Sequence, residues 1–106
     1  SLDAIASFRQ ALANPLYTTP DLARFHLGRS LVHEGDYQKA MEAFEDALVV
    51  SPPNVPPALL HLELGRVYYK LGFERRSKET LTKVMTLDKG GEYAAAANEL
   101  LTRLKP

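Results

Sequence analysis

The sequence predicts an all-α protein in which antiparallel helix pairs stack into a solenoid. The first observation is an internal repeat, since Gly28 recurs as Gly65 and Gly35 recurs as Gly72, each 37 positions later. Periods of about 20–50 residues are typical of arrays built from one supersecondary unit. The second observation is that apolar side chains recur three and four residues apart within each repeat, as they do along one face of an α-helix.

The opening segment, residues 1–15, is expected to form one helix over Asp3–Asn14. It aligns with the second helix of a pair at a shift of 36 positions. The matching residues are Ala4, Phe8, Ala11 and Leu12 against Ala40, Phe44, Ala47 and Leu48. We therefore expect this helix to belong to a truncated repeat whose first helix would precede residue 1.

The first complete repeat is predicted over residues 20–52. Thr19 is expected to cap its first helix, with Pro20 at the first helical position and Asp21 in the first turn. This helix should end near Glu34, because Gly35 can adopt the left-handed conformation that terminates helices.

The second helix of this repeat is expected to begin after a capping Asp36 and to run to about Val50. Pro52 and Pro53 follow, and proline interrupts a helix because it lacks the N–H donor and clashes with the preceding turn. The helix carries one apolar stripe, formed by Ala40, Met41, Phe44, Ala47 and Leu48.

The second repeat is predicted over residues 57–89, as helices Pro57–Leu71 and Glu74–Leu87. Gly90 and Gly91 then break the chain, and residues 91–105 are expected to hold a last, capping helix over Glu92–Leu104.

Glycine inside a helix is unfavourable by about 1 kcal/mol relative to alanine. Gly28 and Gly65 nevertheless occupy the same position in the first helix of each repeat. We expect a neighbouring helix to approach the backbone so closely there that no side chain fits.

The composition narrows the classes of function. Thirteen basic and thirteen acidic residues cancel, so the chain has no electrostatic footprint for nucleic acid. The absence of cysteine excludes disulfides, thiolate metal sites and cysteine nucleophiles.

His26 and His33 are seven residues apart without tight ligand spacing, so no metal site and no cofactor are predicted. Ser30 lies near both histidines but lacks the strained turn that exposes a nucleophile, and we do not expect an enzyme.

The repeats resemble the tetratricopeptide repeat family. The first matches its signature at Leu27, Gly28, Gly35, Tyr37, Ala40, Phe44, Ala47 and Pro52, and the second matches at Leu64, Gly65, Tyr68 and Gly72. The second departs from the pattern at Ser77, Leu81, Val84 and Lys89. The resemblance implies a right-handed superhelix whose concave groove binds a protein or peptide.

Within such a groove, the first helix of each pair would supply the contact residues. These are expected to be Phe25, Arg29, His33, Leu62, Arg66 and Tyr69. The two arginines are 37 positions apart and could hold a carboxylate, or each could pair with a nearby glutamate such as Glu34 or Glu63. The carboxylate clamp of chaperone-binding members needs lysine and asparagine at these positions, so a chaperone tail is not the expected ligand.

The alternative function is self-association into a homo-oligomer. If the opening helix lacks its partner helix, part of its apolar side would be exposed and available to a second copy. The expected contact residues are Ile5, Phe8 and Leu12.

A narrower resemblance concerns the run from Ala11 to Pro20, ALANPLYTTP, which is similar to a segment of the type IV pilus assembly lipoproteins. In that family a tetratricopeptide array in the periplasm helps an outer-membrane secretin ring to assemble. The resemblance implies a periplasmic or outer-membrane-associated protein, whereas the repeat pattern alone is compatible with the cytoplasm. No apolar run approaches the roughly 18 residues of a membrane span.

Overall fold

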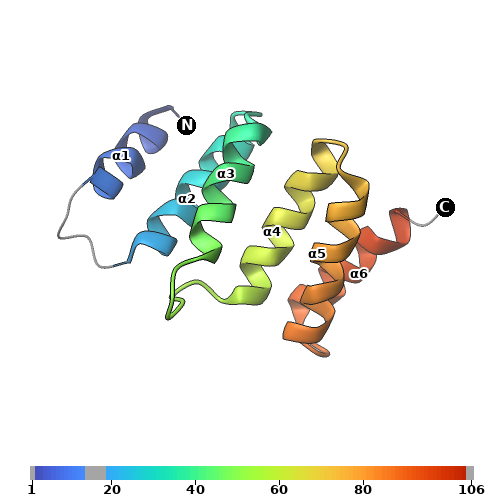
Figure 1. The fold of residues 1–106 in the computed structure, drawn as a ribbon. Coiled ribbons are helices and arrows are strands. Elements are labelled where there is room, and N and C mark those ends of the chain that lie inside the picture. Colours follow the sequence, from blue (N-terminus) through green and yellow to red (C-terminus); the bar gives the residue numbers. More distant parts are fainter. Residues whose placement is uncertain (1, 14–18, 105–106) are drawn as a thin grey trace. The chain divides into compact units, whose positions relative to one another are not determined.

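The computed structural model describes residues 2–13 and 19–104, and within this part of the chain all regular secondary structure is helical. The described helices are α1 (Leu2–Ala13), α2 (Pro20–His33), α3 (Tyr37–Leu48), α4 (Pro57–Lys70), α5 (Glu74–Leu87) and α6 (Glu92–Arg103), drawn in Figure 1. The predicted all-α class and the helix-pair pattern are confirmed. The helices form two compact units: an N-terminal unit that ends at Val55 and a C-terminal unit that begins at Pro56.

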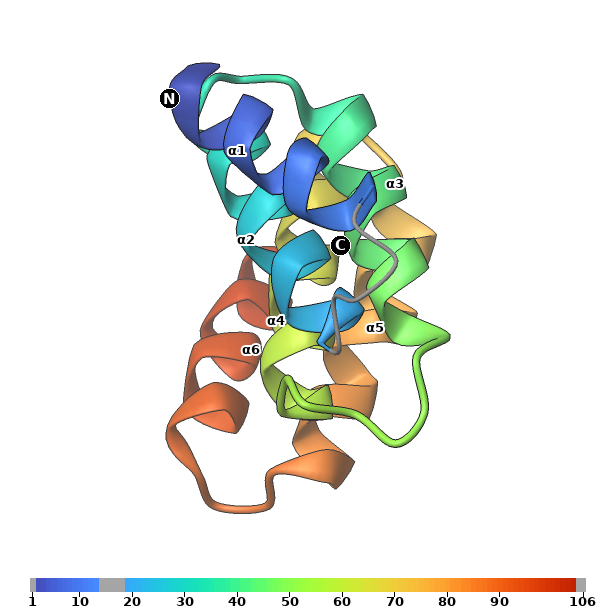
Figure 2. The same ribbon diagram turned by 90° about the vertical axis from the view of Figure 1, so that its left-hand side faces the viewer.

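In the N-terminal unit, α2 and α3 form a hairpin and α1 packs against α2 (Figures 1 and 2). Gly35 ends α2 with φ +82°, as the sequence predicts. Its N–H donates to the carbonyl of Val32 (2.9 Å), and the N–H of Asp36 donates to that of Leu31 (2.9 Å). The carboxylate of Asp36 then accepts a hydrogen bond from the N–H of Lys39 (3.2 Å), which confirms the predicted cap of α3.

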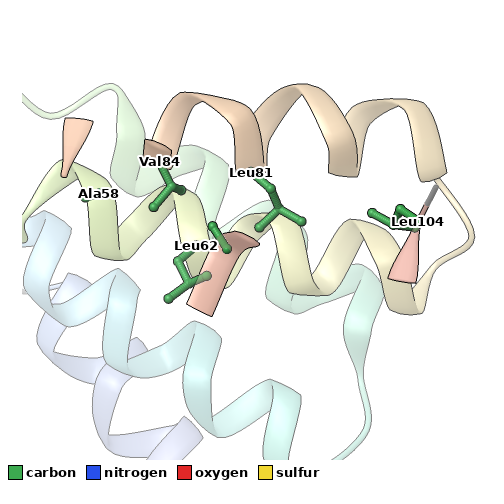
Figure 3. Packing of buried hydrophobic residues seen from close by; sticks show 6 residues of the cluster. Ala58, Leu62, Leu81, Val84 and Leu104 are labelled. Carbon is green, nitrogen blue, oxygen red and sulfur yellow. The ribbon is translucent and has the colours of Figure 1, made fainter. Parts of the chain in front are cut away.

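The C-terminal unit repeats this hairpin with α4 and α5, and α6 packs against both. Gly72 occupies the same left-handed conformation, with φ +83°. The core of this unit contains Ala58, Leu62, Leu81, Val84, Ala97 and Leu104. Figure 3 shows Leu81 and Val84 on the side of α5 that faces α4. The start of α6 is capped by Asp88, whose carboxylate accepts from the N–H groups of Tyr93 (2.9 Å) and Ala94 (3.2 Å).

The two helical glycines are sites of close packing, as predicted. A Cβ atom added at Gly28 would lie 2.5 Å from the Phe44 ring, and one added at Gly65 would lie 2.6 Å from a methyl group of Leu81. Phe44 and Leu81 are themselves fully buried. In both repeats, therefore, a large side chain of the second helix lies directly on the backbone of the first.

Ser77 shows how the second repeat accommodates a departure from the family pattern. This residue is fully buried on α5, where the first repeat has Ala40. Its hydroxyl donates to the carbonyl of Gly65 (2.8 Å), so the buried polar group is satisfied. Serine in place of alanine keeps the side chain small and adds a hydrogen bond between α5 and α4.

Candidate protein-binding surface

The exposed face of α2 carries two of the predicted contact residues, Arg29 and His33, one helical turn apart. The guanidinium carbon of Arg29 lies 5.8 Å from the centroid of the Phe25 ring. Such a position is favourable because the ring face is electron-rich. The ring therefore favours this position of the arginine side chain, and Arg29 as a residue is exposed to solvent.

Phe25 is not the exposed anchor that the sequence analysis expected. Only 3% of its surface is accessible, and its ring centroid lies 5.8 Å from that of Phe44 on α3. The helical periodicity correctly places Phe25 next to Arg29, but packing against α3 covers the ring. The contribution of Phe25 to this surface is the contact of its ring with the Arg29 guanidinium.

The corresponding face of α4 presents Arg66 and Tyr69, and Tyr69 is 40% exposed. One guanidinium nitrogen of Arg66 lies 2.7 Å from a carboxylate oxygen of Glu63, so the pairing with a nearby glutamate occurs on this helix. Arg29 and Arg66 occupy equivalent repeat positions but differ in local chemistry. Arg29 lies over an aromatic ring, whereas Arg66 has a carboxylate neighbour.

Leu62 is also buried rather than exposed. It is 3% accessible and belongs to the core cluster of the C-terminal unit. Leu62 and Phe25 share one repeat position, and both serve the core of their own unit. The predicted set thus divides into four exposed residues, Arg29, His33, Arg66 and Tyr69, and two buried ones.

The described residues of the surface predicted for self-association on α1, Ile5 and Phe8, are buried and half-buried. Ile5 is 7% accessible, so the expectation that it is exposed is wrong, because α1 packs against α2. Phe8 is half-buried, and its ring stacks on His26 of α2 with centroids 5.7 Å apart and an interplanar angle of 19°. The side chain of Leu12 lies outside the described residues.

Asp21 has a structural role that the sequence analysis missed. Asp21 is 1% accessible, and its carboxylate accepts hydrogen bonds from the N–H of Asn54 (2.7 Å), the side-chain amide of Asn54 (2.9 Å) and the N–H of Val55 (3.0 Å). Burial by itself raises the pKa of Asp21, but the hydrogen bonds favour the charged form more strongly and leave the pKa below its ordinary value. The expected cap, Thr19, makes no side-chain hydrogen bond to the helix.

Four large apolar side chains are exposed among the described residues: Val49, Tyr69, Phe73 and Leu87. Tyr69 is among the predicted contact residues, whereas Phe73, which lies in the turn between α4 and α5, is not. The repeat comparison does distinguish Phe73, because this aromatic residue occupies the position at which Asp36 caps α3 in the first repeat. An apolar residue at a helix-capping position is the pattern that could have indicated it.

The described residues include no cluster of three or more histidine, cysteine or acidic side chains suited to a metal ion. Within the same ranges, no helix has both the length and the apolarity needed to cross a bilayer.

Comparison with known proteins places the repeat pattern in a family. The family model described as "Tetratricopeptide repeat" matches residues 2–58. Comparison with curated proteins gives no match. The matched region contains α1, α2 and α3, the Gly28–Phe44 contact and the turn at Gly35. Because the family model covers more than half of the 106 residues, the chain belongs to the tetratricopeptide repeat family.

Proposed function

We propose that this chain binds a partner protein or peptide through the exposed faces of α2 and α4. Tetratricopeptide repeats generally mediate protein–protein interaction and are typically scaffolds rather than enzymes. The observation that carries the proposal is the position of Arg29, an exposed guanidinium above the buried ring of Phe25. Its repeat equivalent, Arg66, is exposed as well, and Tyr69 adds an exposed aromatic ring.

The chemistry of these side chains favours a partner that carries carboxylates. The guanidinium group is planar and offers paired N–H donors that match the two oxygens of a carboxylate. Arg29 is already oriented by Phe25, so less conformational entropy is lost when it binds. Arg66 would have to share its donors with Glu63. We therefore expect Arg29 to contribute more to binding than Arg66.

The proposal is tested with the chain as bait in a pull-down, followed by calorimetry on the partner that is identified. Arg29→Ala should weaken binding by about tenfold or more, as truncation of arginine anchors commonly does. Arg66→Ala should have a smaller effect. Arg103→Ala is a matched control, because Arg103 is exposed, lies 3.4 Å from Glu99 on α6 and belongs to neither proposed face. Unchanged affinity in a folded Arg29→Ala variant would contradict the proposal.

A narrower proposal is that the partner belongs to type IV pilus or secretin assembly. Its support is the resemblance of the run from Ala11 to Pro20, of which residues 14–18 lie outside the described part of the chain. The full-length gene product should then carry a signal peptide and a lipidated cysteine and should fractionate with the outer membrane. A cytoplasmic product without an export signal would remove this narrower proposal and leave the binding proposal intact.

Self-association through α1 is the weaker alternative. Burial of Ile5 and the stacking of Phe8 on His26 remove much of the apolar surface on which it depended. Of the predicted contact residues whose side chains the structure describes, Phe8 alone keeps a partly exposed side chain.

A further inference from the structure

The turn between α4 and α5 carries a cluster of two aromatic rings and an arginine. Phe73 is 40% exposed, and its ring centroid lies 6.4 Å from that of Tyr68. The guanidinium carbon of Arg76 lies 5.5 Å from the Phe73 ring centroid and 5.9 Å from that of Tyr68. An open depression of about 480 Å³ lies beside the cluster and is lined by residues 72–76.

Comparison with the first repeat shows that the hairpin does not require this cluster. At the position of Phe73 the first repeat has Asp36, which caps α3 by accepting from the N–H of Lys39. Phe73 makes no such bond, so α5 begins without a side-chain cap. Loss of a capping side chain normally destabilises a helix. The second repeat thus has an exposed aromatic ring at a position where the first gains stability from a carboxylate.

We propose that this aromatic–arginine cluster, formed by Tyr68, Phe73, Arg75 and Arg76, binds an acidic segment of a partner protein in which an apolar side chain stands next to carboxylates. The exposed ring of Phe73 supplies apolar contact area, and Arg76 is held over the rings with its donors available to a carboxylate. Arg75 adds a second guanidinium. Its ion pair with Glu79 (3.5 Å) is highly exposed, and such pairs contribute little and exchange readily.

Local charge selects an acidic partner over a basic one. Residues 70–79 contain four basic side chains, Lys70, Arg75, Arg76 and Lys78, and two acidic ones, Glu74 and Glu79. The equivalent residues of the first repeat, 33–42, instead contain three acidic side chains, Glu34, Asp36 and Glu42, and one basic side chain, Lys39. The cluster shares no residue with the faces of α2 and α4 described above, so this proposal and the proposed function can fail independently.

The test is an NMR titration of the whole chain, labelled with ¹⁵N, with an acetylated and amidated Glu-Glu-Leu-Glu-Glu peptide. Saturable shifts are expected at the amides of residues 72–76. The matched Gln-Gln-Leu-Gln-Gln peptide should bind at least tenfold more weakly, because it keeps the leucine and lacks the carboxylates. Arg76→Ala and Phe73→Asp should each weaken binding of the acidic peptide by tenfold or more. Lys39→Ala, which removes the equivalent cation of the first repeat, should not change it.

Phe73→Asp places a capping residue type at the start of α5, so a thermal melt is expected to show that the fold is retained. If that variant does not fold, Arg76→Ala decides the question, because its side chain is exposed. Several outcomes would overturn the proposal: no saturable shift in the parent, shifts confined to α2 and α4, or parental affinity in Arg76→Ala. Equal shifts from inorganic phosphate would also overturn it, since the ring and the leucine would then contribute nothing.

Discussion

At the scale of single residues, Gly28 and Gly65 look equivalent in sequence but meet different neighbours. A Cβ atom at Gly28 would strike a planar aromatic ring, that of Phe44, whereas one at Gly65 would strike the branched end of Leu81. A leucine side chain can change rotamer more readily than a packed ring can move. Both glycines are therefore explained by the close approach of a side chain, but we expect Gly65 to tolerate a larger residue better than Gly28.

We predict that Gly28→Ala lowers the free energy of unfolding more than Gly65→Ala. Alanine gains about 1 kcal/mol of helix propensity, while overpacking typically costs about 1–3 kcal/mol. Gly28→Leu and Gly65→Leu should both be destabilising by roughly 1–3 kcal/mol. Urea denaturation measures these differences. A leucine variant as stable as the parent would show that the close approach does not hold in solution.

Asp21 connects the start of α2 to the segment that follows α3. Because its folded pKa lies below the unfolded value, its contribution to stability is fully present above the unfolded pKa, near 4, and is lost as the pH falls through the folded pKa. We predict that Asp21→Asn destabilises the chain by about 1.5–3 kcal/mol at pH 7, as expected for hydrogen bonds to a charged group.

The difference between the parent and Asp21→Asn should shrink as the pH is lowered toward 3 in denaturation experiments. Asp46→Asn, a change at an exposed carboxylate on α3, is the control and should have little effect. A stability difference that does not change with pH would mean that the charge on Asp21 is not what holds Asn54 and Val55.

At the scale of elements, α1 is the helix whose environment differs most from expectation. It packs against α2, its residue Ile5 is buried, and Phe8 stacks on His26. We predict that the amides of residues 6–10 are protected from hydrogen exchange in dilute protein, because this packing is within one chain. Phe8→Asp should lower stability without changing the sedimentation coefficient. A parent dimer that Phe8→Asp converts to monomer would instead support self-association through α1.

The second helices of the two hairpins, α3 and α5, differ in whether a side chain caps their first turn, although the hairpins are otherwise alike. Asp36 caps α3 with its side chain, whereas α5 begins at Phe73 without such a bond. Both turns nevertheless close through a glycine with positive φ. The turn geometry therefore depends on the glycine, which leaves the following position free to carry either a cap or an exposed ring.

At the scale of the whole molecule, the formal charge of zero means that any attraction to an acidic partner is local. Exposed charges are screened over a Debye length of about 10 Å at 0.1 M salt. We predict that affinity for a partner bound through the exposed faces of α2 and α4 falls severalfold between 50 and 300 mM salt, and that this dependence largely disappears in the Arg29→Ala, Arg66→Ala double variant. Calorimetry at several salt concentrations measures it. A salt dependence that persists in the folded double variant would place the electrostatic contacts elsewhere.

The helices, their pairing and the close contacts at the glycines could all be predicted from the order of residues along the chain. Helix ends follow from local chemistry: Gly35 and Gly72 adopt positive φ, and Asp36 caps the next helix. The repeat spacing predicts which helices pair, because each pair is one unit of the period. These properties depend on neighbours in the chain, which the sequence contains directly.

Which residues of a helix face remain exposed could not be predicted in this way, because it depends on the tertiary packing. Periodicity places Phe25 and Arg29 on adjacent parts of α2, but the ring of Phe25 is covered by packing near Phe44, and Leu62 is covered by the core of its own unit. Asp21 meets Asn54, 33 positions away, through contacts that no local pattern encodes. The physical reason is that burial depends on which surfaces meet across the fold, whereas helical spacing specifies only the direction in which a side chain points.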